Sequence, residues 1–84
     1  MTNTIQIIDL KQLGAIMRVV RKSQNLRQDE VGRFSHTLIG DLEAGKPTAQ
    51  VGKVIAAMRE LGIRLHVELP AGLDIPAALR EPMK

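Results

Sequence analysis

Apolar residues recur three or four positions apart in three stretches of the chain. This spacing gathers them on one helical face and therefore predicts three amphipathic helices. The predicted inward faces are Leu10, Leu13, Ile16, Met17 and Val20 in residues 10–23; Leu38, Ile39 and Leu42 in residues 36–44; and Val51, Val54, Ile55, Met58 and Leu61 in residues 49–61. Two shorter helices are expected at residues 27–32, where Leu26 and Val31 provide the apolar anchors, and at residues 75–80.

Residues that favour helix ends bracket these stretches. The expected N-caps are Asp9, Ser35 and Thr48. Gln12 completes a capping-box pattern with Asp9. The expected C-terminal residues are Asn25, Gly45 and Gly62. Phe34, the only aromatic residue, is expected to fill the junction between the second and third helices.

After Gly62 the apolar period changes from 3.6 to 2. Residues 63–69 are expected to form a half-buried strand, because Ile63, Leu65, Val67 and Leu69 alternate with Arg64, His66 and Glu68. A lone strand leaves its backbone groups unsatisfied, so this one needs a partner. Two partners are open: the β-branched segment Thr4–Ile8, itself a short strand or an extended arm, and the same strand of a second protomer.

Size and composition narrow the possible functions. A chain of 84 residues buries only about 60–65% of its unfolded surface, which argues against an enzyme cleft. Without cysteine, stability must come from helix packing and self-association. Neither a secretory signal nor an apolar stretch of about 20 residues is visible, so we expect a cytoplasmic protein without a membrane partner. We expect one domain, residues 1–84, with a helical core (9–62), a dimerisation strand (63–69) and a C-terminal tail (70–84).

The net charge of +3 is unevenly distributed. Residues 1–53 hold eight Lys and Arg against five Asp and Glu, whereas residues 54–84 hold four of each sign. A basic excess in the first half suits phosphate binding. A solvated surface of ordinary charges is the alternative.

Residues 26–48 read as two short helices at an angle, as in helix-turn-helix proteins that place the second helix in the DNA major groove. The side chains expected to reach base edges are His36, Thr37, Gly40 and Asp41, because they lie opposite the inward face near the helix N-terminus. A plain solvent-facing helix is the alternative. The residues expected to contact phosphates are Arg27, Gln28, Arg33, Ser35, Lys46 and Lys53. Glu43 is expected to form a structural ion pair with Arg21.

The sequence gives little support to three other functions: phosphate binding by a P-loop, metal binding and catalysis. The run from Gly40 to Lys46 matches most of a phosphate-binding P-loop, but Pro47 replaces the required Ser or Thr. His36 and His66 lie thirty residues apart with no cysteine near either, so no metal is expected. No nucleophile and base converge within a segment that could form a pocket, so we expect neither an enzyme nor a cofactor.

Three runs of residues resemble the Xre (Cro/cI-type) helix-turn-helix family. They are Leu13-Gly14 with Arg18 and Arg21-Lys22, then Leu26-x-Gln28, then Ile39-x-x-Leu42-Glu43-x-Gly45-Lys46. The continuation Gly-Lys-Pro-Thr-Ala-Gln-Val-Gly-Lys-Val over residues 45–54, with Leu61-Gly62 closing its helix, is similar more specifically to HipB-type antitoxins. The resemblance covers residues 10–66.

This resemblance implies a mainly α, lambda-repressor-like domain of four to five helices whose C-terminal β-strand pairs across a homodimer. It implies binding to double-stranded operator DNA of the protein's own operon and association with a HipA-like serine/threonine kinase toxin. It also places Gln28, Ser35, His36, Thr37, Gly40 and Asp41 at DNA-facing positions.

One difference from the family concerns the second helix. Between Val31 and Phe34 the chain is about three residues shorter than the family pattern, which normally gives this helix another turn. Either the spacing is rebuilt around Arg33 and Phe34, or DNA binding is altered. The leading hypothesis is therefore an autoregulatory antitoxin and transcriptional repressor. The alternatives are a stand-alone Xre-type repressor and a partner-neutralising interaction module with little DNA binding.

Overall fold

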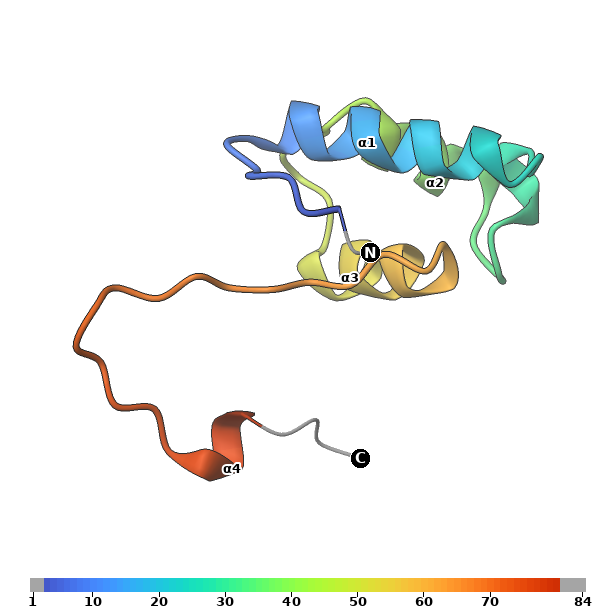
Figure 1. Cartoon of the computed structure of the whole chain (residues 1–84). Helices are drawn as coiled ribbons and strands as arrows, with labels where there is room; N and C mark the ends of the chain where they lie inside the picture. The colour runs from blue at the N-terminus through green and yellow to red at the C-terminus, as the bar shows by residue number, and fades with distance from the viewer. Residues whose placement is uncertain (1–2, 81–84) are drawn as a thin grey trace.

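The computed structural model describes residues 3–80. Its elements are α1 (Leu10–Ser23), the 3-10 turn η1 (Gln28–Glu30), α2 (His36–Glu43), α3 (Val51–Glu60) and α4 (Ala77–Arg80). Helices α1, α2 and α3 pack into one body, and the chain after α3 leads away from it to the small α4 (Figure 1). The fold of the described residues is thus small and mainly helical. No helix among them has the length and apolar character that a membrane crossing requires.

α1 has the bounds that the sequence predicts, and local hydrogen bonds set them. Its cap Asp9 accepts a hydrogen bond from the backbone N–H of Gln12 at 2.7 Å. The Gln12 carboxamide oxygen accepts in turn from the N–H of Ile8 at 2.8 Å, one residue earlier than in a standard capping box. Beyond the C-terminus, Asn25 takes the expected left-handed conformation, with φ of 59°.

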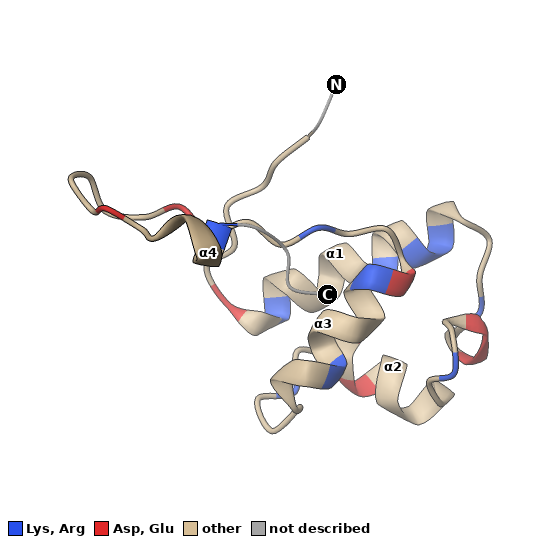
Figure 2. Cartoon of the chain, turned by 90° about the horizontal axis from the view of Figure 1, so that it is seen from below, with Lys and Arg blue, Asp and Glu red and all other residues tan. Residues whose placement is uncertain are grey.

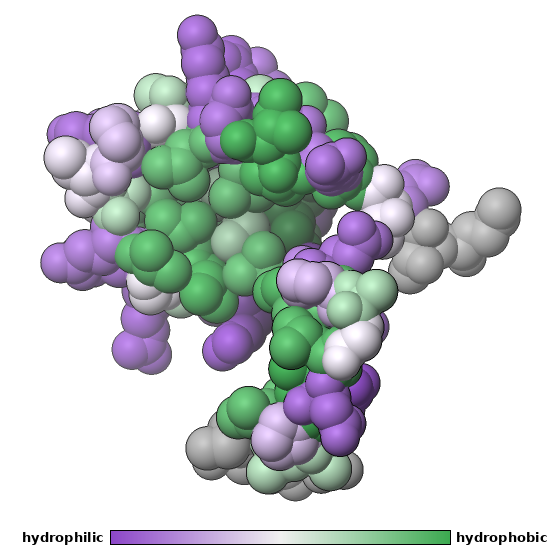
Figure 3. Space-filling model, turned by 90° about the vertical axis from the view of Figure 1, so that its left-hand side faces the viewer, coloured by the Kyte–Doolittle hydropathy of each residue, from purple (hydrophilic) through white to green (hydrophobic). Residues whose placement is uncertain are grey.

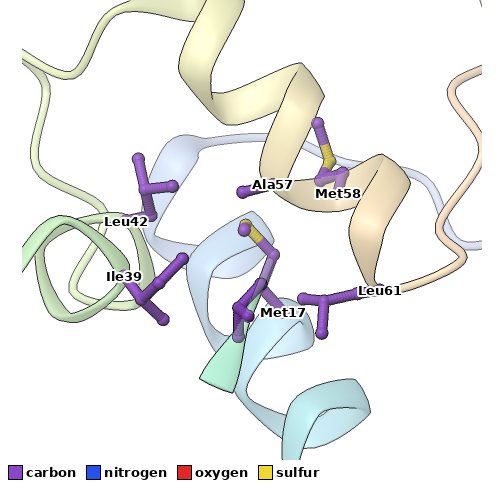
Figure 4. Close-up of a cluster of buried hydrophobic side chains, with 7 residues drawn as sticks. Met17, Ile39, Leu42, Ala57, Met58 and Leu61 are labelled. Carbon is purple, nitrogen blue, oxygen red and sulfur yellow. The ribbon is translucent and has the colours of Figure 1, made fainter. Parts of the chain in front are cut away.

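Seven buried apolar residues form the core between the three helices and the loop before α2. They are Met17, Val31, Ile39, Leu42, Ala57, Met58 and Leu61. The six that Figure 4 labels converge from α1, α2 and the C-terminal end of α3. All but Ala57 are inward anchors predicted from the sequence, Val31 as the anchor of residues 27–32 and the others from the helical periodicity. Phe34 is half-buried and packs against this core, as expected.

α1 and the end of α2 approach so closely that no side chain fits between their backbones. A Cβ atom on Gly14 would lie within 3 Å of the carbonyl oxygens of Leu42 and Glu43. Just beyond α2, Gly45 has a φ of +73°, and a Cβ there would lie 2.5 Å from Lys11 Cα. Both glycines are therefore required for α2 to lie against α1 at this distance.

The predicted helix over residues 27–32 is wrong. Only Gln28–Glu30 form a 3-10 turn, and its cap box joins the Arg27 N–H to Glu30 Oε1 at 2.7 Å. Val31 then takes an extended conformation and Gly32 a φ of +53°, neither of which continues a helix. The shortened segment thus buries Val31 with a turn instead of a full helix.

The predicted cap at Thr48 and the inward placement of Val51 are also wrong. Pro47 and Thr48 lie in a turn closed by a hydrogen bond from the Ala49 N–H to the Lys46 carbonyl, at 3.2 Å. α3 therefore begins at Val51, after Gln50, whose side chain makes no cap hydrogen bond. In this first turn Val51 is 70% exposed. Leu10, at the first position of α1, is likewise 44% exposed instead of inward.

The predicted strand does not form in the single chain. Residues 63–70 run without secondary structure, and so does the segment Thr4–Ile8, which is an arm and not a strand. Within residues 3–80 neither segment forms backbone hydrogen bonds with the other, so the pairing that a strand requires is missing. α4 is two residues shorter than predicted, and the last residues of the predicted tail, 81–84, lie outside the described part.

Candidate nucleic-acid interface

The first turn of α2 lies at the surface. Ser35 caps the helix as predicted, its Oγ accepting a hydrogen bond from the Leu38 N–H at 3.1 Å. The next two residues, His36 and Thr37, are exposed, and His36 Nε2 lies 3.5 Å from Thr37 Oγ1. On the opposite face, Ile39 and Leu42 enter the core. α2 therefore presents a short polar surface whose orientation is fixed by the packing behind it.

A buried ion pair joins α2 to α1. Arg21 donates from both Nε and Nη2 to the two carboxylate oxygens of Glu43, the second bond measuring 3.1 Å, and its Nη1 donates to the Leu26 carbonyl at 2.7 Å. The two side chains are 8% and 5% exposed. This is the ion pair that the sequence predicts, and it fixes the C-terminal end of α2 with bidentate geometry.

The environment of this pair favours its charged form. Burial alone would raise the pKa of Glu43, but hydrogen bonds from Arg21 and Gln28, together with the charges of Arg21 and Arg18, outweigh burial and lower it. The hydrogen bond to Glu43 raises the pKa of Arg21. The pair therefore stays ionised at neutral pH.

Gln28 connects the Arg21–Glu43 ion pair to η1. Its Nε2 donates to Glu43 Oε1 at 3.1 Å, and its carboxamide lies where a Cβ on Gly40 would be in ordinary contact, 3.6–3.7 Å away. η1 is thereby attached to the C-terminal end of α2, and the Gln28 carboxamide lies beside the middle of the helix. The turn η1 is thus joined to α2 by a side-chain hydrogen bond, a contact that the sequence did not reveal.

A shallow groove separates α2 from the start of α3. It is lined by Leu38, Asp41, Lys46, Thr48, Ala49, Gln50 and Lys53. Three predicted DNA-contacting residues meet here: Asp41, Lys46 and Lys53. Lys46 Nζ lies 3.6 Å from Asp41 Oδ2 across the groove. Thr48 and Gln50 line it as well, although the sequence suggested only a capping role for Thr48.

The other predicted phosphate contacts lie before α2. Arg27 is exposed, and its Nε lies 3.1 Å from Asp29 and 3.6 Å from Glu30. Arg33 is exposed in the loop that leads into Ser35. Basic segments therefore stand on either side of α2, in the preceding loop and in α3, while α2 itself carries no Lys or Arg (Figure 2). The structure thus places the predicted phosphate-contacting residues in two groups, one before α2 and one after it.

Comparison with known proteins identifies the class to which this arrangement belongs. An uncharacterised HTH-type transcriptional regulator of Sinorhizobium fredii, y4mF, is 49% identical to this chain over 61 residues, covering 69% of this chain and 80% of that protein. The chain belongs to the helix-turn-helix transcriptional regulators. No protein-family model and no solved structure matched it.

In this helix-turn-helix regulator, the sequence predicts α2 as the second helix of the motif, and where it predicts the first helix the structure has only the turn η1. DNA-binding regulation of transcription is accordingly the function of its class.

Proposed function

We propose that this regulator is a sequence-specific repressor that acts as a dimer and inserts the first turn of α2 into the major groove. The observation that carries the proposal is that α2 is exposed on one face and firmly packed on the other. Its inner face is fixed by the core and by the buried Arg21–Glu43 pair, while His36 and Thr37 are exposed at its N-terminus. A helix held in this way can offer side chains to base edges without an ordering cost at binding.

Four polar positions carry the proposed base contacts. Thr37 can bond a base or touch a thymine methyl group, and His36 can donate to guanine. Asp41 can accept from a cytosine amino group, while Gly40 allows close approach of the backbone. Asp41 also lies beside Lys46, so its negative charge is offset where it nears the DNA backbone.

The proposed phosphate contacts flank α2 on both sides. Arg27, Gln28, Arg33 and Ser35 lie before it, and Lys46 and Lys53 lie in the groove behind it. Each cation that neutralises a phosphate adds to the salt dependence of binding without adding sequence preference. Gln28 remains able to contact a phosphate, because a carboxamide has a second N–H besides the one donated to Glu43.

The proposed dimer uses residues 63–69. An antiparallel pair centred on His66 places Arg64 of one copy opposite Glu68 of the other, twice, and puts the four apolar residues Ile63, Leu65, Val67 and Leu69 on the opposite face. Opposite charges across a strand pair favour this register, and a twofold pair would present two α2 helices to successive turns of the duplex.

The more specific role proposed is that of a HipB-like antitoxin. The run from Ile39 to Thr48 and its continuation to Val54 supports this role by its similarity to HipB-type proteins. In this role the dimer represses its own operon and binds a HipA-like serine/threonine kinase toxin through surfaces away from the groove. A stand-alone Xre-type repressor would share the DNA interface and lack the toxin.

One observation favours a second candidate function. η1 is a single 3-10 turn where helix-turn-helix proteins have a helix, so the chain has a smaller surface beside the DNA backbone. A module that neutralises a partner protein and binds DNA weakly fits this reduction.

Titration onto the DNA upstream of the protein's own gene, at several salt concentrations, distinguishes the repressor from the interaction module. The repressor binds one site there more tightly than scrambled DNA of equal length, with affinity falling steeply as salt rises. Equal affinity for both DNAs would contradict it. Co-expression with the neighbouring gene product then distinguishes the HipB-like antitoxin from the stand-alone repressor. Only the antitoxin should co-purify with a kinase-like partner.

A further inference from the structure

The single chain exposes more surface than a compact protein of its mass. Its accessible area is 7190 Å², compared with about 4,900 Å² for a compact monomer of 9.2 kDa. Its radius of gyration of 14.3 Å exceeds the value of about 11.8 Å that is typical of a compact domain of 84 residues. The excess area of about 2,300 Å² is larger than the roughly 800 Å² that each partner buries in a standard interface.

Much of the exposed apolar surface belongs to two extended segments. In the N-terminal arm, Thr4–Ile8, the side chains of Ile5, Ile7 and Ile8 are 60%, 42% and 77% exposed. In the C-terminal segment, residues 63–69, Leu65, Val67 and Leu69 are 53%, 80% and 45% exposed. An apolar surface on the helical body continues onto the projecting chain (Figure 3).

The N-terminal arm is held in place by side-chain hydrogen bonds, although its isoleucines are largely exposed. The Gln12 carboxamide accepts from the Ile8 N–H at 2.8 Å and donates to the Gln6 carbonyl at 3.0 Å. These bonds occupy two of the arm's backbone groups and fix its course beside the start of α1. Within residues 3–80, no backbone hydrogen bond joins the arm to the C-terminal segment of the same chain.

We propose that the N-terminal arm of one copy adds as a strand to the C-terminal segment of a second copy. The proposal rests on the dimer described above. In that dimer each C-terminal segment pairs with its twin along one edge and leaves the other edge open. The arm supplies a strand for that open edge, so two segments and two arms complete a sheet of four strands across the twofold axis.

The features of the chain favour a second copy as the partner that covers the arm and the C-terminal segment. Among residues 3–80 the arm and the segment each lack a strand partner, and both contain mainly Ile, Leu and Val at their apolar positions. A twofold axis can pair both reciprocally. Ile5 and Ile7 of the arm can then join Ile63, Leu65, Val67 and Leu69 on one face of the sheet. The exposed excess is large enough for such an intertwined interface, which buries more than a standard contact.

Cysteine cross-linking tests the proposal in the full chain, which has no cysteine of its own. One chain carries Ile7→Cys, and a second, distinguishable by a tag, carries Leu65→Cys, Val67→Cys or Leu69→Cys in turn. The two are mixed and oxidised, so that any adduct of unlike chains joins arm to segment between copies. We expect at least one pair to exceed, by about tenfold or more, the yield of a control in which Val19→Cys of α1 replaces the arm cysteine. Val19 is 68% exposed and so is equally accessible.

Three other results would overturn the arm proposal, and they differ in what they imply for the dimer. Cross-linking of Leu65→Cys chains to Val67→Cys chains, which face each other in the proposed strand pair, with arm adducts no better than the control, would overturn the arm proposal and leave the dimer intact. An intrachain disulfide in the double variant Ile7→Cys/Val67→Cys, without adducts between chains, would also overturn it. A wild-type chain that sediments as a monomer at all concentrations would overturn both the dimer and the arm.

Discussion

Arg21 and Glu43 form an ion pair beneath the surface, although they stand twenty-two residues apart in the chain. Arg21 belongs to α1, and Glu43 is the last residue of α2. Gln28 of η1 donates to the same carboxylate, so one acidic side chain connects α1, η1 and α2. The orientation of the surface proposed to read DNA thus depends on a contact that the DNA would not touch.

Replacing Glu43 by Gln should destabilise the protein strongly. The change leaves the Arg21 guanidinium buried without its counter-charge, which costs about 3 kcal/mol of unfolding free energy. Urea unfolding followed by circular dichroism measures the loss. Asp29→Asn is the matched control, because it breaks the exposed Arg27–Asp29 pair and should cost less than about 1 kcal/mol. Equal losses in the two variants would contradict the role given to the buried pair.

The same carboxylate makes stability fall in acid. Because the pKa of Glu43 is lower in the folded than in the unfolded chain, ionised Glu43 stabilises the fold above its unfolded pKa of about 4.3. This contribution disappears as the pH falls through the lower, folded pKa. Melting temperatures measured from pH 7 to pH 3 should therefore drop less steeply in Glu43→Gln than in the wild type. If the melting temperatures of the two proteins fall in parallel, a group other than Glu43 causes the loss of stability in acid.

Gly14→Ala should be destabilising, whereas Gly52→Ala should not. An Ala Cβ at position 14 would lie 2.4 Å from the Leu42 carbonyl oxygen and would push α2 away from α1, at a cost of about 1–3 kcal/mol. At position 52, in the exposed first part of α3, nothing lies within 4 Å of the new Cβ. There the higher helix propensity of Ala should add up to about 1 kcal/mol. Urea unfolding measures both, and a neutral Gly14→Ala would disprove the close packing.

Lys53→Ala should weaken binding to every DNA sequence alike. Loss of one phosphate contact lowers the slope of log affinity against log salt by about one, without changing which sequence is preferred. Fluorescence anisotropy at four salt concentrations measures this slope. Arg80→Ala, which removes the same charge from α4, is the control and should leave the slope unchanged. A Lys53→Ala slope equal to that of the wild type would remove Lys53 from the interface.

Val67→Asp should turn the proposed dimer into monomers without unfolding them. Val67 is 80% exposed in the single chain, so the substitution disturbs no intrachain packing, but it places two charges in the apolar face of the paired strands. Sedimentation velocity measures the association. Val19→Asp introduces the same charge at a position 68% exposed and should still dimerise. Dimers of Val67→Asp as tight as the wild type would contradict the use of residues 63–69.

Local chemistry explains which parts of the fold could be predicted. The ends of α1 and the start of α2 follow from short-range hydrogen bonds at Asp9, Ser35 and Asn25, and sequence spacing alone specifies these. The core anchors Met17, Ile39 and Leu42 follow from helical periodicity for the same reason.

The errors arise where tertiary context decides. The segment 27–32 has the composition of a helix, yet the positive φ of Gly32 and the extended Val31 end it after one turn. Pro47 and Thr48 resemble a helix start, yet the turn after Gly45 occupies them and delays α3 to Val51. Within the candidate site, the Ser35 cap and the Arg21–Glu43 ion pair could be predicted from the sequence. The Gln28–Glu43 bond and the groove between α2 and α3 could not, because they depend on the packing angle of α2.

The most direct test of the central claim, that α2 reads base edges, is the binding-site preference of Thr37→Ala. The wild type and the variant are each selected against a library of randomised DNA duplexes at one salt concentration, and the enriched sequences are compared. Thr37→Ala should relax or change the preference at one or two adjacent base pairs in each half-site, while keeping affinity for non-specific DNA within about twofold of the wild type. An unchanged preference accompanied by uniformly weaker binding would contradict the account, because Thr37 would then act on the backbone and not on the bases.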